Sequence, residues 1–286
     1  MGCGLFRTEG QAAVILEFAD FTYKGDVNQL GKPHGRGKYT WSDGDCYEGD
    51  FVNGFRQGRG VMSFNNGDRY EGPFCENLYQ GNGVFTYSNG DKYEGEFHEG
   101  EMHGDGVLQS KDLRYAGPFL NGKKSGKGIE TFTNGNMYEG DFSVGVRSGY
   151  GVFTFANGDV YTGTWKRNQR NGKGKHSFAN GNSYEGEYKV DMMHGKGTYS
   201  TRNGDIYVGE FMDNKMSGRG IYNYINGDRY EGEFLSNLFH GYGVMVFKNG
   251  DKYEGMFRCD KHHGLGKLSY AGGFVVEGRW VDGELQ

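Results

Sequence analysis

The chain has 286 residues, of which only 35% are hydrophobic, and its formal net charge is −5. The low hydrophobic content excludes a protein built around one deep core, and the acidic balance argues against a nucleic-acid-binding protein, which presents an excess of Lys and Arg on one face. No apolar run approaches the roughly 18 residues of a membrane-spanning helix. The four cysteines lie far apart without a C-x-x-C pair, which indicates reduced thiols in a cytoplasmic protein.

Residues 1–20 form an irregular N-terminal segment. The apolar residues between Val14 and Phe18 predict a cap strand that covers the edge of a following sheet. The start Met1-Gly2-Cys3 has a second interpretation, namely acylation of Gly2 and Cys3, although Phe6 stands where that motif has Ser or Thr. Both interpretations stay open at this stage.

A repeat of about 23 residues runs through residues 21–286, and a fixed period of this length is the signature of a repeat array. Its most regular feature is a tyrosine followed two residues later by glycine. A twelfth copy has Val276 in place of the tyrosine. The repeated tyrosines are Tyr23, Tyr47, Tyr70, Tyr93, Tyr115, Tyr138, Tyr161, Tyr184, Tyr207, Tyr230 and Tyr253.

Each repeat reads as a β-hairpin. In the first strand, period-two alternation places Tyr47, Gly49 and Phe51 on one face. The second strand of a repeat obeys the same rule with a G-x-G pair followed by aromatic residues. Asn-Gly pairs such as Asn66-Gly67 separate the repeats and predict type I′ turns. The sequence therefore predicts an all-β fold, an elongated single-layer antiparallel β-meander with one glycine- and aromatic-rich face.

The array has one irregular region. Between residues 107 and 131 the Asn-Gly turn is missing, Ser110 occupies an aromatic position, and Glu130 occupies a position on the ring face. A buried carboxylate without a partner is costly, so we predict a local bend at residues 107–131.

The motif Y-E-G-E-F, followed by H-G-x-G, an aromatic residue and N-G-D, resembles the MORN (membrane occupation and recognition nexus) repeat. Tyr93-Glu94-Gly95-Glu96-Phe97 is a nearly ideal copy, and about twelve copies cover almost the whole chain. The resemblance implies a scaffold found at cytoskeletal structures, membrane junctions or ciliary axonemes. It also implies homodimers formed through terminal repeats, here the C-terminal ones. In family members that are enzymes a separate catalytic domain follows the repeats, and this chain has no room for one.

The aromatic face is the first candidate binding surface, because Tyr, Trp and Phe dominate interface hot spots and a single-layer sheet cannot bury both of its faces. We expect it to receive an extended or helical segment of a partner protein. The candidate residues are Tyr87, Tyr93, Phe97, Phe153, Phe155, Tyr161 and Trp165.

A basic patch is the second candidate, because both usual acids of the Y-E-G-E-F motif are threonine in the repeat that begins at Tyr161. Such a patch could meet anionic phospholipid headgroups or an acidic partner segment. The candidate residues are Lys166, Arg167, Arg170, Lys173 and Lys175.

Catalytic, cofactor-binding and metal-binding residues are not expected. The G-x-G pairs have no following helix that could supply a phosphate site. The histidines recur once per repeat, roughly 10 Å apart by strand spacing, whereas metal ligands converge on one ion. We therefore predict a non-catalytic, cytoskeleton-associated scaffold or adaptor, with a peripheral tether to anionic membranes as the alternative.

Overall fold

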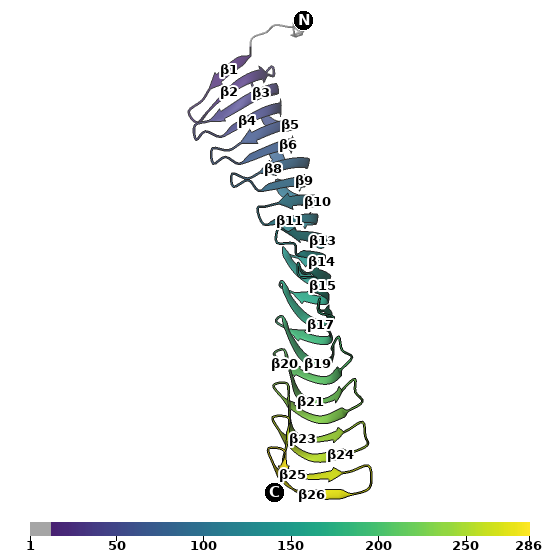
Figure 1. The fold of residues 1–286 in the computed structure, drawn as a ribbon. Coiled ribbons are helices and arrows are strands. Elements are labelled where there is room, and N and C mark those ends of the chain that lie inside the picture. The colour runs from purple at the N-terminus through teal and green to yellow at the C-terminus, as the bar shows by residue number, and fades with distance from the viewer. Residues whose placement is uncertain (1–12) are drawn as a thin grey trace. The chain divides into compact units, whose positions relative to one another are not determined.

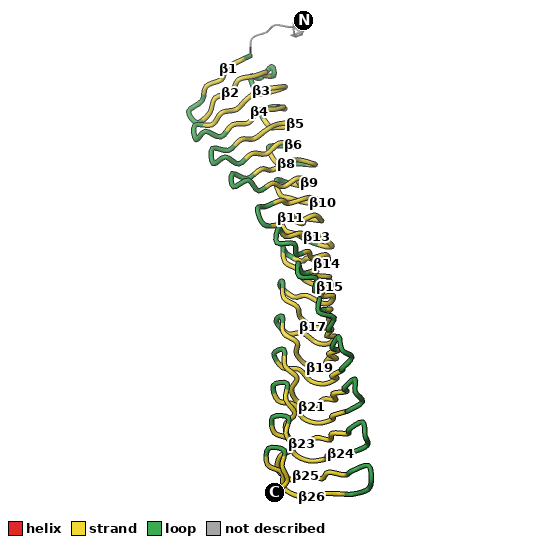
Figure 2. Tube along the Cα trace, in the orientation of Figure 1, coloured by secondary structure: helices red, strands yellow, loops and turns green. Residues whose placement is uncertain are grey.

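The computed structural model describes residues 13–286, and every regular element in this range is a β-strand (Figures 1 and 2). The chain divides into two units, with the boundary between Asn134 and Gly135. Each unit is a single-layer antiparallel sheet in which strands that follow one another in sequence pair with one another. The described residues contain no helix long and apolar enough to cross a membrane. The predicted all-β meander of hairpins is confirmed.

The described part of the first unit, from residue 13 to residue 134, contains thirteen strands, of which β1 pairs with β2 at the N-terminal edge of the sheet. The strands are β1 (Val14–Glu17), β2 (Phe21–Val27), β3 (Pro33–Trp41), β4 (Cys46–Val52), β5 (Phe55–Ser63), β6 (Arg69–Cys75), β7 (Leu78–Tyr79), β8 (Gly81–Thr86), β9 (Lys92–His98), β10 (Glu101–Gln109), β11 (Leu113–Leu120), β12 (Lys123–Lys124) and β13 (Gly126–Phe132).

The second unit repeats the same hairpin. Two-residue strands such as β7 and β12 of the first unit do not recur there before β27, its last element. The strands are β14 (Met137–Ser143), β15 (Val146–Thr154), β16 (Val160–Lys166), β17 (Gln169–Ser177), β18 (Ser183–Lys189), β19 (Met192–Ser200), β20 (Ile206–Met212), β21 (Lys215–Asn223), β22 (Arg229–Leu235), β23 (Leu238–Val246), β24 (Lys252–Arg258), β25 (Lys261–Ser269), β26 (Val275–Val281) and β27 (Glu284–Leu285).

A β-bulge follows the glycine of the Y-x-G motif in most repeats. Between β20 and β21 the register shifts between Gly209 and Glu210, and Gly218, the first glycine of the G-x-G pair, has a φ of 61°. A bulge bends its strand and increases the local twist. The bulges therefore curl each single layer toward its aromatic face, which explains how one sheet can bury side chains without a second layer.

The Asn-Gly turns differ from the prediction. Type I′ turns need positive φ at both central residues, but of Asn66 and Gly67 only Gly67 has it, with a φ of 93°. The Gly67 N–H donates to the Phe64 carbonyl at 2.9 Å, so the loop is a turn over Asn65 and Asn66 that closes on a left-handed glycine. Two successive positive φ values occur instead at the opposite sheet edge, as at Val190 (51°) and Asp191 (66°).

Loops thus join the strands of each sheet at both strand ends. We call the side with the Asn-Gly turns the Asn-Gly rim and the opposite side, with the loops of two positive φ values, the two-residue rim. Side chains join neighbouring loops along both. On the Asn-Gly rim, Asp228 Oδ1 accepts the Lys248 N–H of the next loop at 2.8 Å. On the two-residue rim, Asp260 Oδ1 accepts the Phe239 N–H of the preceding hairpin at 2.7 Å. These bonds satisfy loop amides that the strand ladder cannot reach.

The irregular region predicted between residues 107 and 131 lies within the first unit. Glu130 is buried there on the aromatic face, and its carboxylate forms an ion pair of 2.7 Å with Lys124 Nζ. The strands nevertheless pair in order, with Val107 opposite Ala116 and Ala116 opposite Ile129. The bend itself stays a prediction.

Candidate binding groove

A buried tyrosine forms the centre of each repeat. Tyr207 is 1% exposed, and its ring lies over Gly209 of its own strand and Gly220 of the next. A Cβ added to Gly220 would lie 2.6 Å from the Tyr207 Oη and 2.7 Å from its Cζ, so only glycine leaves room for the ring. The Tyr207 hydroxyl donates to the Glu210 carbonyl at 2.8 Å across the bulge. Burial raises the pKa of Tyr207, so the hydroxyl stays protonated and can donate.

Aromatic side chains four residues later connect the repeats. The Tyr207 ring contacts Phe211 of its own strand and Phe234 of the next repeat, with centroids 5.1 and 4.8 Å apart and near-perpendicular planes. Edge-to-face pairs of this kind add roughly 0.5 to 1.5 kcal/mol each beyond their buried area. Each unit therefore has a narrow core in which every repeat is packed by its neighbours.

A further set of side chains covers each of these tyrosine rings on the side away from the glycines. We call the residue two positions before the first glycine of each G-x-G pair the lid residue. The lid rings of Tyr79 and Phe239 stack on Tyr70 and Tyr230 with centroids 3.8 and 3.7 Å apart, and the Arg170 guanidinium lies 5.6 Å from the Tyr161 ring. The lid residues are Pro33, Arg56, Tyr79, Met102, Lys124, Arg147, Arg170, Met193, Met216, Phe239 and His262.

A row of partly exposed rings lies beside the lid residues, at the Asn-Gly rim. We call these side chains the groove rings. Ser110 and Thr201 take the same place in two other repeats. The groove rings are Trp41, Phe64, Tyr87, Phe132, Phe155, Phe178, Tyr224, Phe247 and Tyr270.

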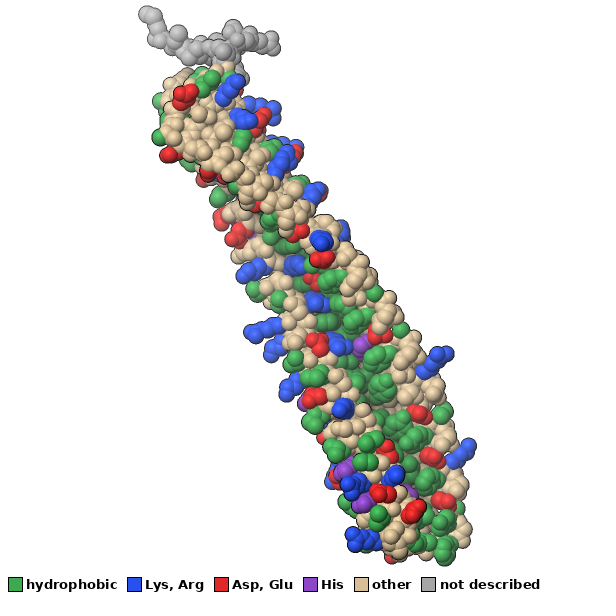
Figure 3. Space-filling view, turned by 60° about the vertical axis from the view of Figure 1, so that its left-hand side comes forward, with side chains coloured by type: hydrophobic (Ala, Val, Ile, Leu, Met, Phe, Trp, Pro, Cys, Tyr) green, Lys and Arg blue, Asp and Glu red, His purple; other side chains and the backbone are tan. Residues whose placement is uncertain are grey.

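The groove rings and lid residues form a concave surface. In the first unit this surface is a groove of about 410 Å³, whose lining comes from both rims of the sheet. A strip of hydrophobic side chains with acidic ones beside it is also visible in the space-filling view (Figure 3). The lining residues of the first-unit groove are Trp41, Asp43, Asp45, Arg56, Met62, Phe64, Asn77, Leu78, Tyr79 and Gly100.

The aromatic residues predicted to meet a partner fall into two groups. Tyr87 and Phe155 are groove rings and are partly exposed. The other five are at most 7% exposed, because the curled sheet, the glycines and the lid residues enclose them, so they belong to the core rather than to a contact surface. These five are Tyr93, Phe97, Phe153, Tyr161 and Trp165.

The predicted basic patch is also divided between the faces. Arg170 lies on the aromatic face as a lid residue, where its Nε forms an ion pair of 3.2 Å with Asp191. Lys173 and Lys175 belong to the opposite, outer face, where they stand in register with Glu187 and Glu185. The side chains of Lys166, Arg167, Lys173 and Lys175 are exposed. Arg170 therefore does not share a surface with Lys173 and Lys175.

His176 is a buried polar residue in the groove floor of the second unit. Its ring stacks on Phe178 at 4.2 Å, its Nδ1 lies 3.1 Å from the Arg170 Nη1, and its Nε2 faces Asp159 Oδ2 at 3.6 Å. Burial and the neighbouring Arg170 lower the pKa of His176. The ring is therefore neutral at pH 7, and its Nδ1 accepts from the guanidinium.

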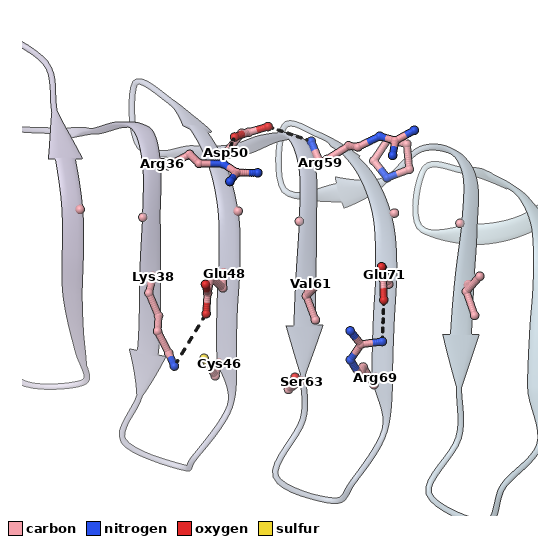
Figure 4. Close-up of a pocket in the computed structure, with 18 of the residues that line it drawn as sticks. Arg36, Lys38, Cys46, Glu48, Asp50, Arg59, Val61, Ser63, Arg69 and Glu71 are labelled. Carbon is pink, nitrogen blue, oxygen red and sulfur yellow. Dashed lines mark hydrogen bonds and ion pairs between the residues drawn. The ribbon is translucent and has the colours of Figure 1, made fainter. Parts of the chain in front are cut away.

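The outer face of the first unit carries a charged trough of about 1550 Å³ (Figure 4). Oppositely charged side chains pair along it, with Lys38 Nζ 4.0 Å from Glu48 and Arg69 Nη1 2.7 Å from Glu71. Such solvated pairs stabilise little, typically about 0 to 1 kcal/mol. Among the described residues, no group of three or more His, Cys, Asp or Glu side chains could hold a metal ion.

The candidate acylation residues Gly2 and Cys3 lie outside the described residues 13–286. Their modification stays a prediction.

The geometry defines a tandem-hairpin repeat protein whose unit is a Tyr-x-Gly strand paired with a G-x-G strand. The MORN repeat matches the chain in eleven consecutive copies, and the chain belongs to the MORN repeat family. The matched residues are 29–46, 47–69, 70–92, 93–112, 115–137, 138–160, 161–183, 184–206, 207–229, 230–252 and 253–275.

Comparison with curated proteins gives no significant match. Among solved structures, the chain is similar to the TCP domain of Drosophila melanogaster SAS-4 (dCPAP), which was solved in complex with a proline-rich motif of Ana2 (dSTIL). The two chains share 14% identity, the match covers 69% of this chain and 83% of that chain, and the TM-score is 0.28. A CPAP G-box domain gives 11% identity, 78% and 100% coverage, and a TM-score of 0.29. The TCP10 domain of Danio rerio CPAP gives 11% identity, 93% and 100% coverage, and a TM-score of 0.26. At these TM-scores the likeness carries no functional argument.

Proposed function

We propose that the chain is a non-catalytic scaffold that binds an extended or helical segment of a partner protein in its aromatic groove. The observation that supports this most directly is the row of partly exposed groove rings above a fully buried core. These rings do not complete the core, since Ser110 and Thr201 replace them in two repeats. Surface aromatic residues in a concave site are the usual anchors of a protein interface.

The spacing of the repeats suits such a partner. Each repeat contributes two strands, so equivalent groove rings of neighbouring repeats are roughly 10 Å apart. Three residues of an extended polyproline II segment make one turn and span about 9.3 Å, and seven residues of an α-helix make about two turns and span about 10.5 Å. A regular segment can therefore place equivalent side chains over successive rings.

The test is affinity capture from the native cell with the full chain as bait, comparing Tyr224→Thr with the unmodified protein. Thr201 shows that the fold accepts threonine at this position. Tyr150→Ala, which removes a tyrosine that is 57% exposed on the outer face, is the matched control. We expect Tyr224→Thr to lower partner recovery severalfold and the control to leave it unchanged. Equal recovery with both variants would contradict the proposal.

The site of action that we propose is the cytoplasm, in association with the cytoskeleton and specifically with a cilium, flagellum or axoneme. The support is the family resemblance, because other proteins with this repeat are found at such structures. Imaging of the fluorescently tagged protein in its native cell, before and after detergent extraction, tests this. Complete loss of the protein on extraction would exclude a cytoskeletal association.

A second candidate function is a peripheral membrane tether. The exposed cations Lys166, Arg167, Lys173 and Lys175 support it, because clustered Lys and Arg side chains attract anionic headgroups. Flotation with phosphatidylserine vesicles should show binding that weakens with salt and is lost when Lys166 and Arg167 are changed to Glu. Vesicle binding that is insensitive to both changes, or absent, would rule out this function.

We also propose homodimerisation through the C-terminal repeats. Neighbouring outer-face positions there carry Tyr242, Met256 and Leu265, which are 50%, 41% and 75% exposed, in place of the charged residues of other repeats. Light scattering should give twice the chain mass for the purified protein and the monomer mass for Met256→Glu with Leu265→Glu. A monomeric unmodified protein at micromolar concentration would contradict this.

A further inference from the structure

The groove changes its chemistry along the second unit. At β15–β17 its lid residues are Arg147 and Arg170, with His176 beside them. At β19–β23 the lid residues are Met193, Met216 and Phe239, so the cations are replaced by thioethers and a ring. Methionine side chains adapt to the shape of an apolar partner.

Carboxylates flank this apolar stretch from both rims. Asp205 and Asp228 lie on the Asn-Gly rim and Asp260 on the two-residue rim, and each accepts a backbone N–H of a neighbouring loop at 2.7 to 2.9 Å. The charges of all three carboxylates act on the groove ring Tyr224. Burial raises the pKa of Tyr224 to about 12, and Tyr222 and the three carboxylates, led by that of Asp260, add to the shift.

Cations lie along both rims as well. Lys215, Arg258 and Lys261 flank the two-residue rim, where alternation with Met216, Phe257 and His262 places their side chains on the outer face. Arg202 and Lys248 are exposed in loops of the Asn-Gly rim, with their aliphatic stems against Gly181 and Gly227 of the preceding loops. His262, the last lid residue, has a pKa lowered by burial and is therefore neutral at pH 7. The stretch from β19 to β25 is thus an apolar floor with carboxylates at both rims.

We infer that this stretch receives a basic amphipathic segment, whose apolar side chains contact the methionines and groove rings and whose Lys or Arg side chains reach the aspartates of both rims. The inference rests on the proposed function and adds the chemical class of the partner. Charge complementarity supports it, because cations at both flanks of the segment would meet carboxylates at both rims. A cation above Tyr224 or Phe247 would also gain from the face of the ring.

The chain itself supplies neutral replacements for these aspartates. Asn182 Oδ1 accepts the Arg202 N–H at 2.8 Å at the position equivalent to Asp228, and Asn214 Oδ1 accepts the Met193 N–H at 2.9 Å at the position equivalent to Asp260. Asp205→Asn, Asp228→Asn and Asp260→Asn together therefore remove three charges and keep the loop hydrogen bonds. The matched control is Glu139→Gln, Glu185→Gln and Glu231→Gln, which removes three exposed charges from the outer face.

The experiment measures binding of two synthetic peptides to the full chain by fluorescence anisotropy. Both peptides have about 18 residues in the same amphipathic pattern, one with Lys and Leu and the other with Glu and Leu. We expect the Lys peptide to bind more tightly than the Glu peptide, and its affinity to fall with added salt. The triple Asn variant should weaken Lys-peptide binding roughly tenfold, and the triple Gln control should not.

Three results would overturn the inference. They are no measurable binding of the Lys peptide, equal or tighter binding of the Glu peptide, and equal loss of Lys-peptide affinity in the Asn and Gln variants. Tyr224→Thr separates these results from failure of the proposed function. If Tyr224→Thr lowers capture of the native partner and the triple Asn variant does not, the groove binds a partner of different charge. If neither variant changes capture, the groove is not the binding site.

Discussion

The contact between Tyr207 and Gly220 predicts a large effect of adding one methyl group. Gly220 lies in β21, has no positive φ, and therefore meets no backbone restriction on carrying a side chain. Its added Cβ would nevertheless overlap the Tyr207 ring. Gly272 is the matched control, because it also has no positive φ and nothing lies within 4 Å of its added Cβ.

The magnitude follows from what the Tyr207 ring loses when it moves. Overpacking of a core costs about 1 to 3 kcal/mol, each of the two edge-to-face contacts about 0.5 to 1.5 kcal/mol, and the hydroxyl bond to Glu210 about 1 kcal/mol. Partial relaxation keeps some of these contacts, so we expect Gly220→Ala to lower the free energy of unfolding by about 3 to 5 kcal/mol. Gly272→Ala should raise it by about 0.4 to 1 kcal/mol, because alanine restricts the unfolded chain.

Urea unfolding followed by circular dichroism measures both values, and hydrogen exchange shows where stability is lost. Because each repeat is packed by its neighbours, exchange in Gly220→Ala should accelerate most in β20 (Ile206–Met212), β21 and β22 (Arg229–Leu235). If the two variants differ by less than about 0.5 kcal/mol, within the usual scatter of surface substitutions, ring-on-glycine packing does not hold the repeats together.

Three further predictions concern single positions. Val190→Asn should raise the free energy of unfolding by about 1 kcal/mol, because a β-branched residue is strained at a φ of 51°; an unchanged urea midpoint would refute this. Because the pKa of His176 is lowered in the folded protein, His176 of the unfolded chain takes up a proton first as the pH falls, so the free energy of unfolding should decrease below pH 6.5. His176→Phe should remove this contribution to the difference in the free energy of unfolding between pH 5 and pH 7.5, measured by unfolding titrations at both pH values. Lys124→Met, which removes a cation from the buried Glu130, should lower the free energy of unfolding by about 3 kcal/mol. Adding Glu130→Phe should restore most of it, and a double variant no more stable than the single one would contradict that account.

Much of the fold could be predicted from the sequence because the same residue pattern recurs in every repeat, so each structural feature is supported by many copies. Alternation in Tyr207, Gly209 and Phe211 fixes which side chains share a face, and it does not depend on where the turns lie. The turn type was predicted wrongly because the same Asn-Gly pair serves two loop geometries. Asn66-Gly67 needs only one left-handed residue, whereas the loop at Val190 and Asp191 needs two without containing a glycine.

The groove was less predictable, because burial depends on curvature that alternation does not encode. Tyr93 and Tyr87 both lie on the aromatic face, yet the curled sheet buries the first completely and leaves the second partly exposed. The lid residues were missed because they have no common residue type. Two features of the sequence could have identified the lid residues. They stand at a constant position two residues before the G-x-G pair, and their side chains are large or cationic where a loop residue would be small.

The lid position also has an evolutionary consequence. Across the chain it accommodates Pro, Arg, Tyr, Met, Lys, Phe and His over the same tyrosine and glycines, so its chemistry is decoupled from the folding of the hairpin beneath, except where Lys124 pairs with the buried Glu130. A substitution of one lid residue changes the contact surface of one repeat and leaves the contact surfaces of the other repeats intact. New specificities can accumulate hairpin by hairpin, and an engineer could compose them in the same way by exchanging one side chain per repeat.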